Sequence, residues 1–195
     1  MKQISAIALG LLLFGLAGVG HSPTALAQSA DGWTTLLDGT NMDGFTPLGD
    51  ANWRGVDGAV QADSGGGFLV SKMPYGDFEL RVEFWSSPDA NSGIFIRCQN
   101  AAAVSDSTCY EVNIFDQRPD PMYRTGGIVD LVKPMAMVNA GNQWNTYEIT
   151  AKGPQLMVKL NGITTVDTRD EKLSRGAFAL QYGAGTMKFR KVQIR

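Results

Sequence analysis

The chain has 195 residues, with 17 lysines and arginines against 19 aspartates and glutamates, and a formal net charge of −2. A chain of this length can bury one good core and falls within the common range of a single domain. The slight acidity gives no reason to expect nucleic acid or an anionic lipid surface as a partner.

The first 27 residues have the pattern of a secretory signal peptide. A basic start is followed by an apolar run over 7–19 and by Ala25-Leu26-Ala27, which has the small-x-small spacing of a signal-peptidase site. We therefore predict a signal peptide over residues 1–27 and a single domain over 28–195. The mature protein is expected in the periplasm or outside the cell, without membrane contact.

The only histidine of the chain, His21, lies inside this predicted signal peptide. A mature domain without histidine has no base for a Ser-His or Cys-His nucleophile system, and it lacks the usual ligands of a zinc site. Oxygen-ligated calcium stays possible, but no specific motif supports it. We expect no cofactor, and any acid-base chemistry must use carboxylates, lysine or tyrosine.

Alternating apolar and polar residues, separated by turn residues, recur from Trp33 to the C-terminus, whereas helical periodicity is missing. Asp57-Gly58 and Asn161-Gly162 each predict a two-residue hairpin turn, because a type I′ turn needs positive φ at both positions. A change of inward phase between Phe189 and Val192 predicts a β-bulge. The expected strands lie in WRGV, AVQA, DFELRVEFW, NSGIFIRC, CYEVNIFD, QWNTYEITA, QLMVKL, ITTVDT, GAFALQYG and TMKFRKVQIR. The pattern predicts an all-β sandwich of two antiparallel sheets.

Polar residues fall opposite the apolar alternation of several strands. The segment 78–85 places Phe78 and three further apolar residues on one face, and the segment 110–115 does the same with Tyr110, Val112 and Ile114. The outward residues that form this polar set are Glu83, Arg97, Glu111, Asn113 and Gln181. Such a face is either solvated or the floor of a binding site, and its repetition over several strands favours a site.

Cys98 and Cys109 are the only cysteines, and they enclose a polar loop of small residues over 99–108. In an exported protein a disulfide is favoured over a pair of buried thiols. We predict that this disulfide clamps the loop and has no redox role.

The segment Glu111 to Asp116 is similar to the E-x-D-x-x-E strand of laminarinase-type β-glucanases, but it carries Asn113 and Asp116 at two of the acidic positions. A retaining glycosidase needs two carboxyl groups about 5–5.5 Å apart. An ordinary endo-glucanase is therefore a weaker interpretation. Aromatic candidates for sugar recognition are Trp85, Tyr123, Trp144 and Tyr182, of which Trp144 is expected in the core or at its rim.

Taken together, the motifs resemble the 3-keto-disaccharide hydrolase domain family, formerly a domain of unknown function, which has a concanavalin A-like jelly-roll fold. The resemblance covers nearly the whole mature chain. It rests on the order and spacing of WTTLLDGTNMDGF, WRGVDGAV, DFELRVEFW, NSGIFIR, YEVNIFD, QWNTYEIT, LNG, GAFALQ and MKFRKVQI.

The resemblance implies cleavage of glycosides whose sugar carries a ketone at C3, by carboxylate-assisted elimination and hydration. Such a reaction needs a base near C2 and a cation or donors at the developing enolate oxygen. The roles that follow are Glu111 or Glu83 as the base, Arg97 at the enolate, and Asp116 or Asn113 in orientation. The expected substrate-binding residues are Asn113, Trp85, Tyr123 and Gln181.

One stretch departs from the family pattern. Where relatives often have T-G-A-I-Y, this chain has Thr125-Gly126-Gly127-Ile128-Val129, without the tyrosine. A step that depends on that tyrosine, or on a histidine, does not carry over. The alternative function is a carbohydrate-binding module without catalysis, since jelly rolls often serve that purpose.

Overall fold

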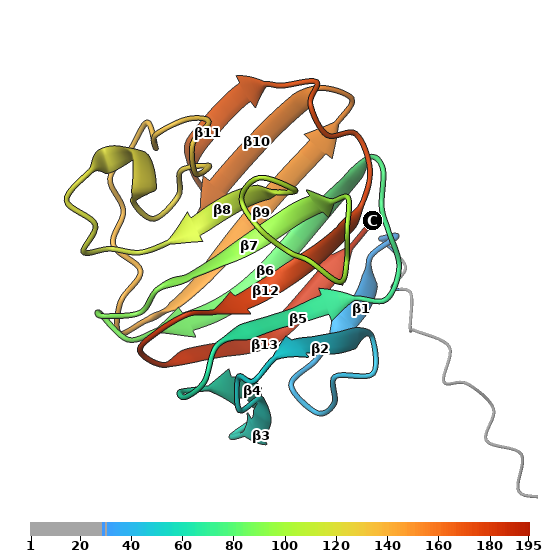
Figure 1. Ribbon diagram of the computed structural model, residues 1–195, viewed down its shortest axis with the longest axis vertical. Coiled ribbons are helices and arrows are strands. Elements are labelled where there is room, and N and C mark those ends of the chain that lie inside the picture. Colours follow the sequence, from blue (N-terminus) through green and yellow to red (C-terminus); the bar gives the residue numbers. More distant parts are fainter. Residues whose placement is uncertain (1–28, 30) are drawn as a thin grey trace, which may run out of the picture.

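The computed structural model describes residue 29 and residues 31–195, so the predicted signal peptide and His21 lie outside the described residues. The described part is built from antiparallel strands and one short 3-10 helix, η1, at Pro121–Tyr123 (Figure 1). It contains no helix that is long and apolar enough to span a membrane. The strands are β1 (Thr34–Leu37), β2 (Phe45–Gly49), β3 (Arg54–Val56), β4 (Ala59–Ala62), β5 (Gly67–Ser71), β6 (Phe78–Ser86), β7 (Ser92–Cys98), β8 (Tyr110–Ile114), β9 (Trp144–Lys152), β10 (Gln155–Leu160), β11 (Ile163–Arg169), β12 (Ala177–Tyr182) and β13 (Met187–Ile194).

The strands form two stacked sheets, as Figure 1 shows. One sheet has eight strands in the order β11-β10-β9-β6-β13-β4-β3, with β1 also paired to β13. The other has five strands in the order β2-β5-β12-β7-β8. In the larger sheet, β4 and β1 share one edge of β13, β4 pairing at its start and β1 at its end.

The local signals of the sequence are confirmed. Asp57 and Gly58 have φ of 50° and 73°, and Asn161 and Gly162 have φ of 52° and 81°, as the two tight hairpin turns require. The pairing of β13 with β6 shifts between Phe189 and Lys191, which is the predicted bulge.

The core lies between the two sheets. Along β6, every second side chain from Phe78 to Ser86 is buried, which confirms the predicted alternation. Aromatic rings pack within each layer of this core: Phe84 of β6 is stacked on Tyr147 of β9 at 5.0 Å, and Phe45 of β2 is edge-on to Phe178 of β12 at 5.7 Å. The prediction of an all-β jelly roll with two antiparallel sheets is confirmed.

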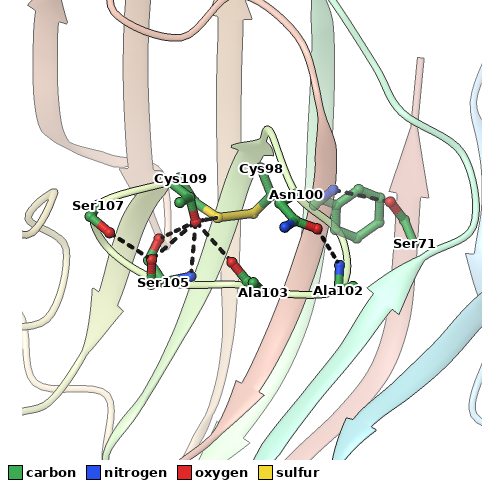
Figure 2. The surroundings of a disulfide bond; sticks show 10 residues. Ser71, Cys98, Asn100, Ala102, Ala103, Ser105, Ser107 and Cys109 are labelled. Carbon is green, nitrogen blue, oxygen red and sulfur yellow. Dashed lines mark hydrogen bonds between the residues drawn. A yellow bond between two sulfur atoms is a disulfide. The ribbon is translucent and has the colours of Figure 1, made fainter.

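A smaller apolar cluster covers the opposite, outer face of the five-stranded sheet. Cys98 and Cys109 form the predicted disulfide, and the loop 99–108 folds over this face. Figure 2 shows the loop drawn together by side-chain hydrogen bonds, among them Ser105 to Ser107 at 2.8 Å. Val104 of the loop packs against this cluster, which is formed by the two cysteines with Val70, Phe95, Ala177 and Ala179. The loop is therefore a fixed wall at one end of the outer face.

The segment 115–143 supplies a second wall beside β8. Its residues 126–129 run along that strand: the Gly126 N–H donates to the carbonyl of Asn113, and the Val129 N–H donates to that of Glu111. The carboxylate of Asp116 anchors the segment by accepting hydrogen bonds from the Ala140 and Gly141 N–H groups, both at 2.8 Å. These contacts hold the segment against the edge of the sheet.

Candidate functional site

Between the two walls, the side chain of Glu111 lies over the backbone of β7 at Gly93, which has no side chain. In the register of β7 and β8, Phe95 is opposite Glu111 and Gly93 is opposite Asn113. A Cβ atom at position 93 would lie 2.8 Å from Oε1 of Glu111 and 2.9 Å from its Cγ. The missing side chain of Gly93 is therefore what allows the carboxylate to lie across β7.

The environment of Glu111 favours its protonated form. Burial, with a smaller contribution from the negative charges of Asp106 and Asp130, raises the pKa of Glu111 to about 7, although the positive charge of Arg118 acts in the opposite direction. A carboxyl group with a pKa near neutrality holds and releases a proton at physiological pH, as a general base must.

Gln181 stands next to this carboxylate with an unused acceptor. Leu180 of β12 is opposite Ile94 of β7, which places the following residue, Gln181, beside Gly93 on the outer face. The side-chain Oε1 of Gln181 is buried without a hydrogen-bond partner. Since buried polar atoms are nearly always paired, this oxygen is suited to accept a hydrogen bond from a bound hydroxyl group.

Tyr123, beside β8, is held through both its backbone carbonyl and its side-chain hydroxyl. Its carbonyl accepts a hydrogen bond of 2.6 Å from the Asn113 side chain, and its hydroxyl donates one of 2.6 Å to Oδ1 of Asp130. This hydrogen bond to Asp130 raises the pKa of Tyr123 and keeps the phenol protonated. The structure thus brings together Glu111, Asn113, Tyr123 and Gln181 from the predicted set, although Asn113 is buried and acts on the Tyr123 backbone.

Arg97 is not part of this site, contrary to the predicted convergence with Glu111. The pairing of β12 with β7 shifts between Ala177 and Ala179, and Arg97 has a φ of 53°. This bulge turns Arg97, which strict alternation would place on the outer face, into the end of the sandwich. Its side chain is 1% exposed, and its guanidinium donates to the carbonyls of Gly76, Gly153 and Leu173 and to Asp77.

Glu83 and Trp85 lie on the other sheet. Both side chains project from the outer face of the eight-stranded sheet, where Glu83 accepts a hydrogen bond of 2.7 Å from Arg190. Trp85 is opposite Trp144, and the Lys188 ammonium lies 5.1 Å from the Trp85 ring centroid. The predicted meeting of Glu83 with Glu111 is therefore wrong, because alternation assigns a face of a strand but not the sheet that the strand joins.

Three other predicted candidates, Asp116, Tyr182 and Trp144, do not join the group around Glu111. The Asp116 carboxylate is occupied by the hydrogen bonds that anchor the segment 115–143, including one from the Thr125 hydroxyl at 2.5 Å. Tyr182 is 4% exposed and packs edge-on against Trp53. Trp144 is 37% exposed, so it lies at the surface and not in the core.

The residues that sequence reasoning missed come from the two walls. Asp106 belongs to the disulfide loop, whereas Asp130 and Arg118 belong to the segment 115–143. Loops have no alternation that reveals which way a side chain points. The neighbourhood of β8 in the sequence is the only signal that could have drawn attention to Arg118.

A metal site is not apparent in residues 29 and 31–195, where no group of three or more His, Cys, Asp or Glu side chains could hold an ion. The expectation that no cofactor is needed stays a prediction.

The sequence matches the 3-keto-alpha-glucoside-1,2-lyase-like domain family over residues 32–195. The chain belongs to this family. The family resemblance drawn from the motifs is thereby confirmed. No curated protein sequence matches the chain.

Solved structures share the fold at low sequence identity. Two proteins of Parabacteroides distasonis, provisionally assigned as glycosyl hydrolases, are similar to it. One has a TM-score of 0.76 and 18% identity over 85% of this chain and 94% of the other; the second has 0.71 and 22% over 84% and 98%. The carbohydrate-binding module CBM66 of Bacillus subtilis has a TM-score of 0.61 and 18% identity over 76% of this chain and 93% of its own.

Proposed function

We propose that the protein is an exported enzyme that cleaves 3-keto-glycosides by carboxylate-assisted elimination across C1 and C2, followed by hydration. Membership of the 3-keto-alpha-glucoside-1,2-lyase-like family supports this reaction class. The disulfide between Cys98 and Cys109 fits an exported protein.

The observation that carries the proposal is the carboxylate of Glu111, held over Gly93 with a pKa of about 7. A ketone at C3 acidifies the proton on C2, so a carboxylate can remove it without a metal ion or a histidine. Glu111 acts as this base, and the unpartnered oxygen of Gln181 accepts a hydroxyl group of the sugar.

The test compares oxidised with unoxidised substrates. Purified protein is incubated with a 3-keto-α-glucoside and with the matching α-glucoside, and released alcohol is measured by chromatography. We expect release from the ketone alone, because only the ketone activates C2. Release from both sugars at similar rates, or from neither, contradicts the proposal.

A carbohydrate-binding module is the second candidate, and the surface tryptophans favour it. Trp85 and Trp144 are neighbours on β6 and β9, and Trp144 is 37% exposed on the outer face of the eight-stranded sheet. Adjacent aromatic rings can stack on the apolar face of sugars. The likeness to CBM66 agrees with such a role. Tight binding of unoxidised glycans that is lost in W144A would support this function over catalysis.

A further inference from the structure

Elimination next to a ketone needs a cation or donors at the enolate oxygen, and the buried guanidinium of Arg97 cannot serve. Its donors are directed to three carbonyl groups and to Asp77 at the end of the sandwich. The reaction assigned to Glu111 therefore requires another cation, or other hydrogen-bond donors, on the outer face of the five-stranded sheet.

Arg118 carries a guanidinium that is near enough to Glu111 for its charge to lower the pKa of that carboxyl group. Its Cζ atom lies 5.0 Å from the ring centroid of Phe115 and 5.7 Å from that of Tyr123. Phe115 directly follows β8, and Tyr123 is fixed by Asn113, two residues beyond Glu111 on the same strand. Two ordered rings thus determine where the guanidinium lies.

The backbone of Arg118 is held as well, since its carbonyl accepts a hydrogen bond of 3.2 Å from the Arg124 side chain. Within residues 29 and 31–195, by contrast, the Arg118 guanidinium takes part in none of the ion pairs. A planar guanidinium stacked on a ring keeps its N–H donors at its edge, where they can bind an oxygen anion in a bidentate manner. Arg118 is therefore oriented by its neighbours and open to a ligand.

We propose that Arg118 is a catalytic residue that binds the C3 oxygen of a 3-keto sugar and stabilises the enolate formed there. This role rests on the proposed function. Glu111 takes the proton from C2, the electron pair of that C–H bond forms the C2–C3 double bond, and the carbonyl π pair moves to the C3 oxygen beside Arg118. The enolate then restores the C3 ketone as a C1–C2 double bond forms. The C1–O bond breaks with its electron pair on the leaving oxygen, which takes a proton from water. The hydroxide so formed adds to C1 in the hydration step, and Glu111 returns its proton to C2, which restores the carboxylate.

Exchange of the C2 hydrogen isolates the enolate step from the later bond cleavage. Wild-type protein, R118M and R118K are incubated in D₂O with a 3-keto-α-glucoside, and both C2 deuteration and alcohol release are followed by NMR. We expect R118M to lose about 100-fold in both rates, the effect of removing one oxyanion donor, and R118K to recover part of the loss.

The matched control is R190M, because Arg190 is also stacked on an aromatic ring, 4.2 Å from the centroid of Trp144, but on the other sheet. It should keep both rates within about twofold, and thermal unfolding confirms that each variant is folded. Undiminished C2 exchange in folded R118M would overturn the role of Arg118 while leaving the proposed function intact. If wild-type protein gives neither exchange nor product, the proposed function fails, and the role of Arg118 fails with it.

Discussion

The outer faces of the two sheets carry similar polar residues in the sequence but treat them differently in the fold. On the eight-stranded sheet, charged groups pair with one another: Glu79 with Lys152 and Arg195, and Glu83 with Arg190. On the five-stranded sheet, Glu111 takes part in none of the ion pairs of the described residues, and Oε1 of Gln181 lacks a partner. A sheet face whose charged groups are paired with one another acts as a solvated surface, whereas a face whose polar groups lack partners can offer them to a ligand.

The difference between the two faces should be largest when one carboxylate on each face is replaced by an amide. E111Q should lower kcat for a 3-keto-α-glucoside by about 100- to 10,000-fold, because an amide cannot accept the C2 proton. E83Q, on the other sheet, should leave kcat within about twofold, since only its surface ion pair with Arg190 is lost. Steady-state kinetics measures kcat for both variants. An equal loss of kcat in E111Q and E83Q would contradict the distinction between the two faces.

The second prediction concerns Arg97, which we assign to stability and not to the site. R97M leaves the Asp77 carboxylate and three carbonyl groups without their buried donor, and should lower the free energy of unfolding by about 3 kcal/mol. R81M, which breaks the solvent-exposed pair with Glu148, should have a much smaller effect. Urea unfolding measures both. A stable R97M without activity would return Arg97 to the site.

The third prediction concerns Gly93, whose missing side chain leaves room for the Glu111 carboxylate. G93A places a Cβ atom 2.8 Å from Oε1 of Glu111 and displaces the carboxylate, which should lower kcat/KM by about 100-fold. G55A is the matched control, because a Cβ there meets nothing within 4 Å. Both positions have backbone angles that alanine adopts, so neither variant should lose its fold. Full activity in G93A would argue against the position assigned to the Glu111 carboxylate.

The smallest predicted effect is the pH dependence of stability. The pKa of Glu111 is raised from 4.5 to about 7 in the folded protein, so folding favours the protonated carboxyl. The stability it contributes is fully present below pH 4.5 and is lost as the pH rises through 7. E111Q, which stays neutral, should therefore exceed wild type by on the order of 2 kcal/mol at pH 8 and match it at pH 4.

Chemical denaturation across this range measures the difference, and the rate of substrate cleavage should rise with an apparent pKa of about 7 as the base ionises. A stability difference between wild type and E111Q that does not change with pH would contradict the burial of this carboxyl group.

The sequence predicted the sandwich well because its signals are local. Asn161-Gly162 and Asp57-Gly58 need only the positive φ of a tight turn, and the alternation from Phe78 onward needs only one buried face. The site was harder to predict. Glu111 and Gln181 were found from alternation, but Arg97 was misplaced by a bulge, and Arg118 lies in a loop without periodicity.

The assignment of strands to sheets also lay beyond local patterns. Glu83 and Glu111 have the same phase on similar strands, yet β6 pairs with β9 and β13 while β8 pairs with β7. Such pairing is decided by contacts between residues far apart in the chain, which a single alternation does not encode.

The central claim, that the ligand binds the outer face of the five-stranded sheet, is tested most directly by mapping backbone amide shifts. ¹⁵N-labelled E111Q, which should bind without turnover, is titrated with a 3-keto-α-glucoside and followed by NMR. We expect shifts confined to β7, β8, β12 and the segment 115–143. Shifts centred instead on β6 and β9, around Trp85 and Trp144, would contradict it.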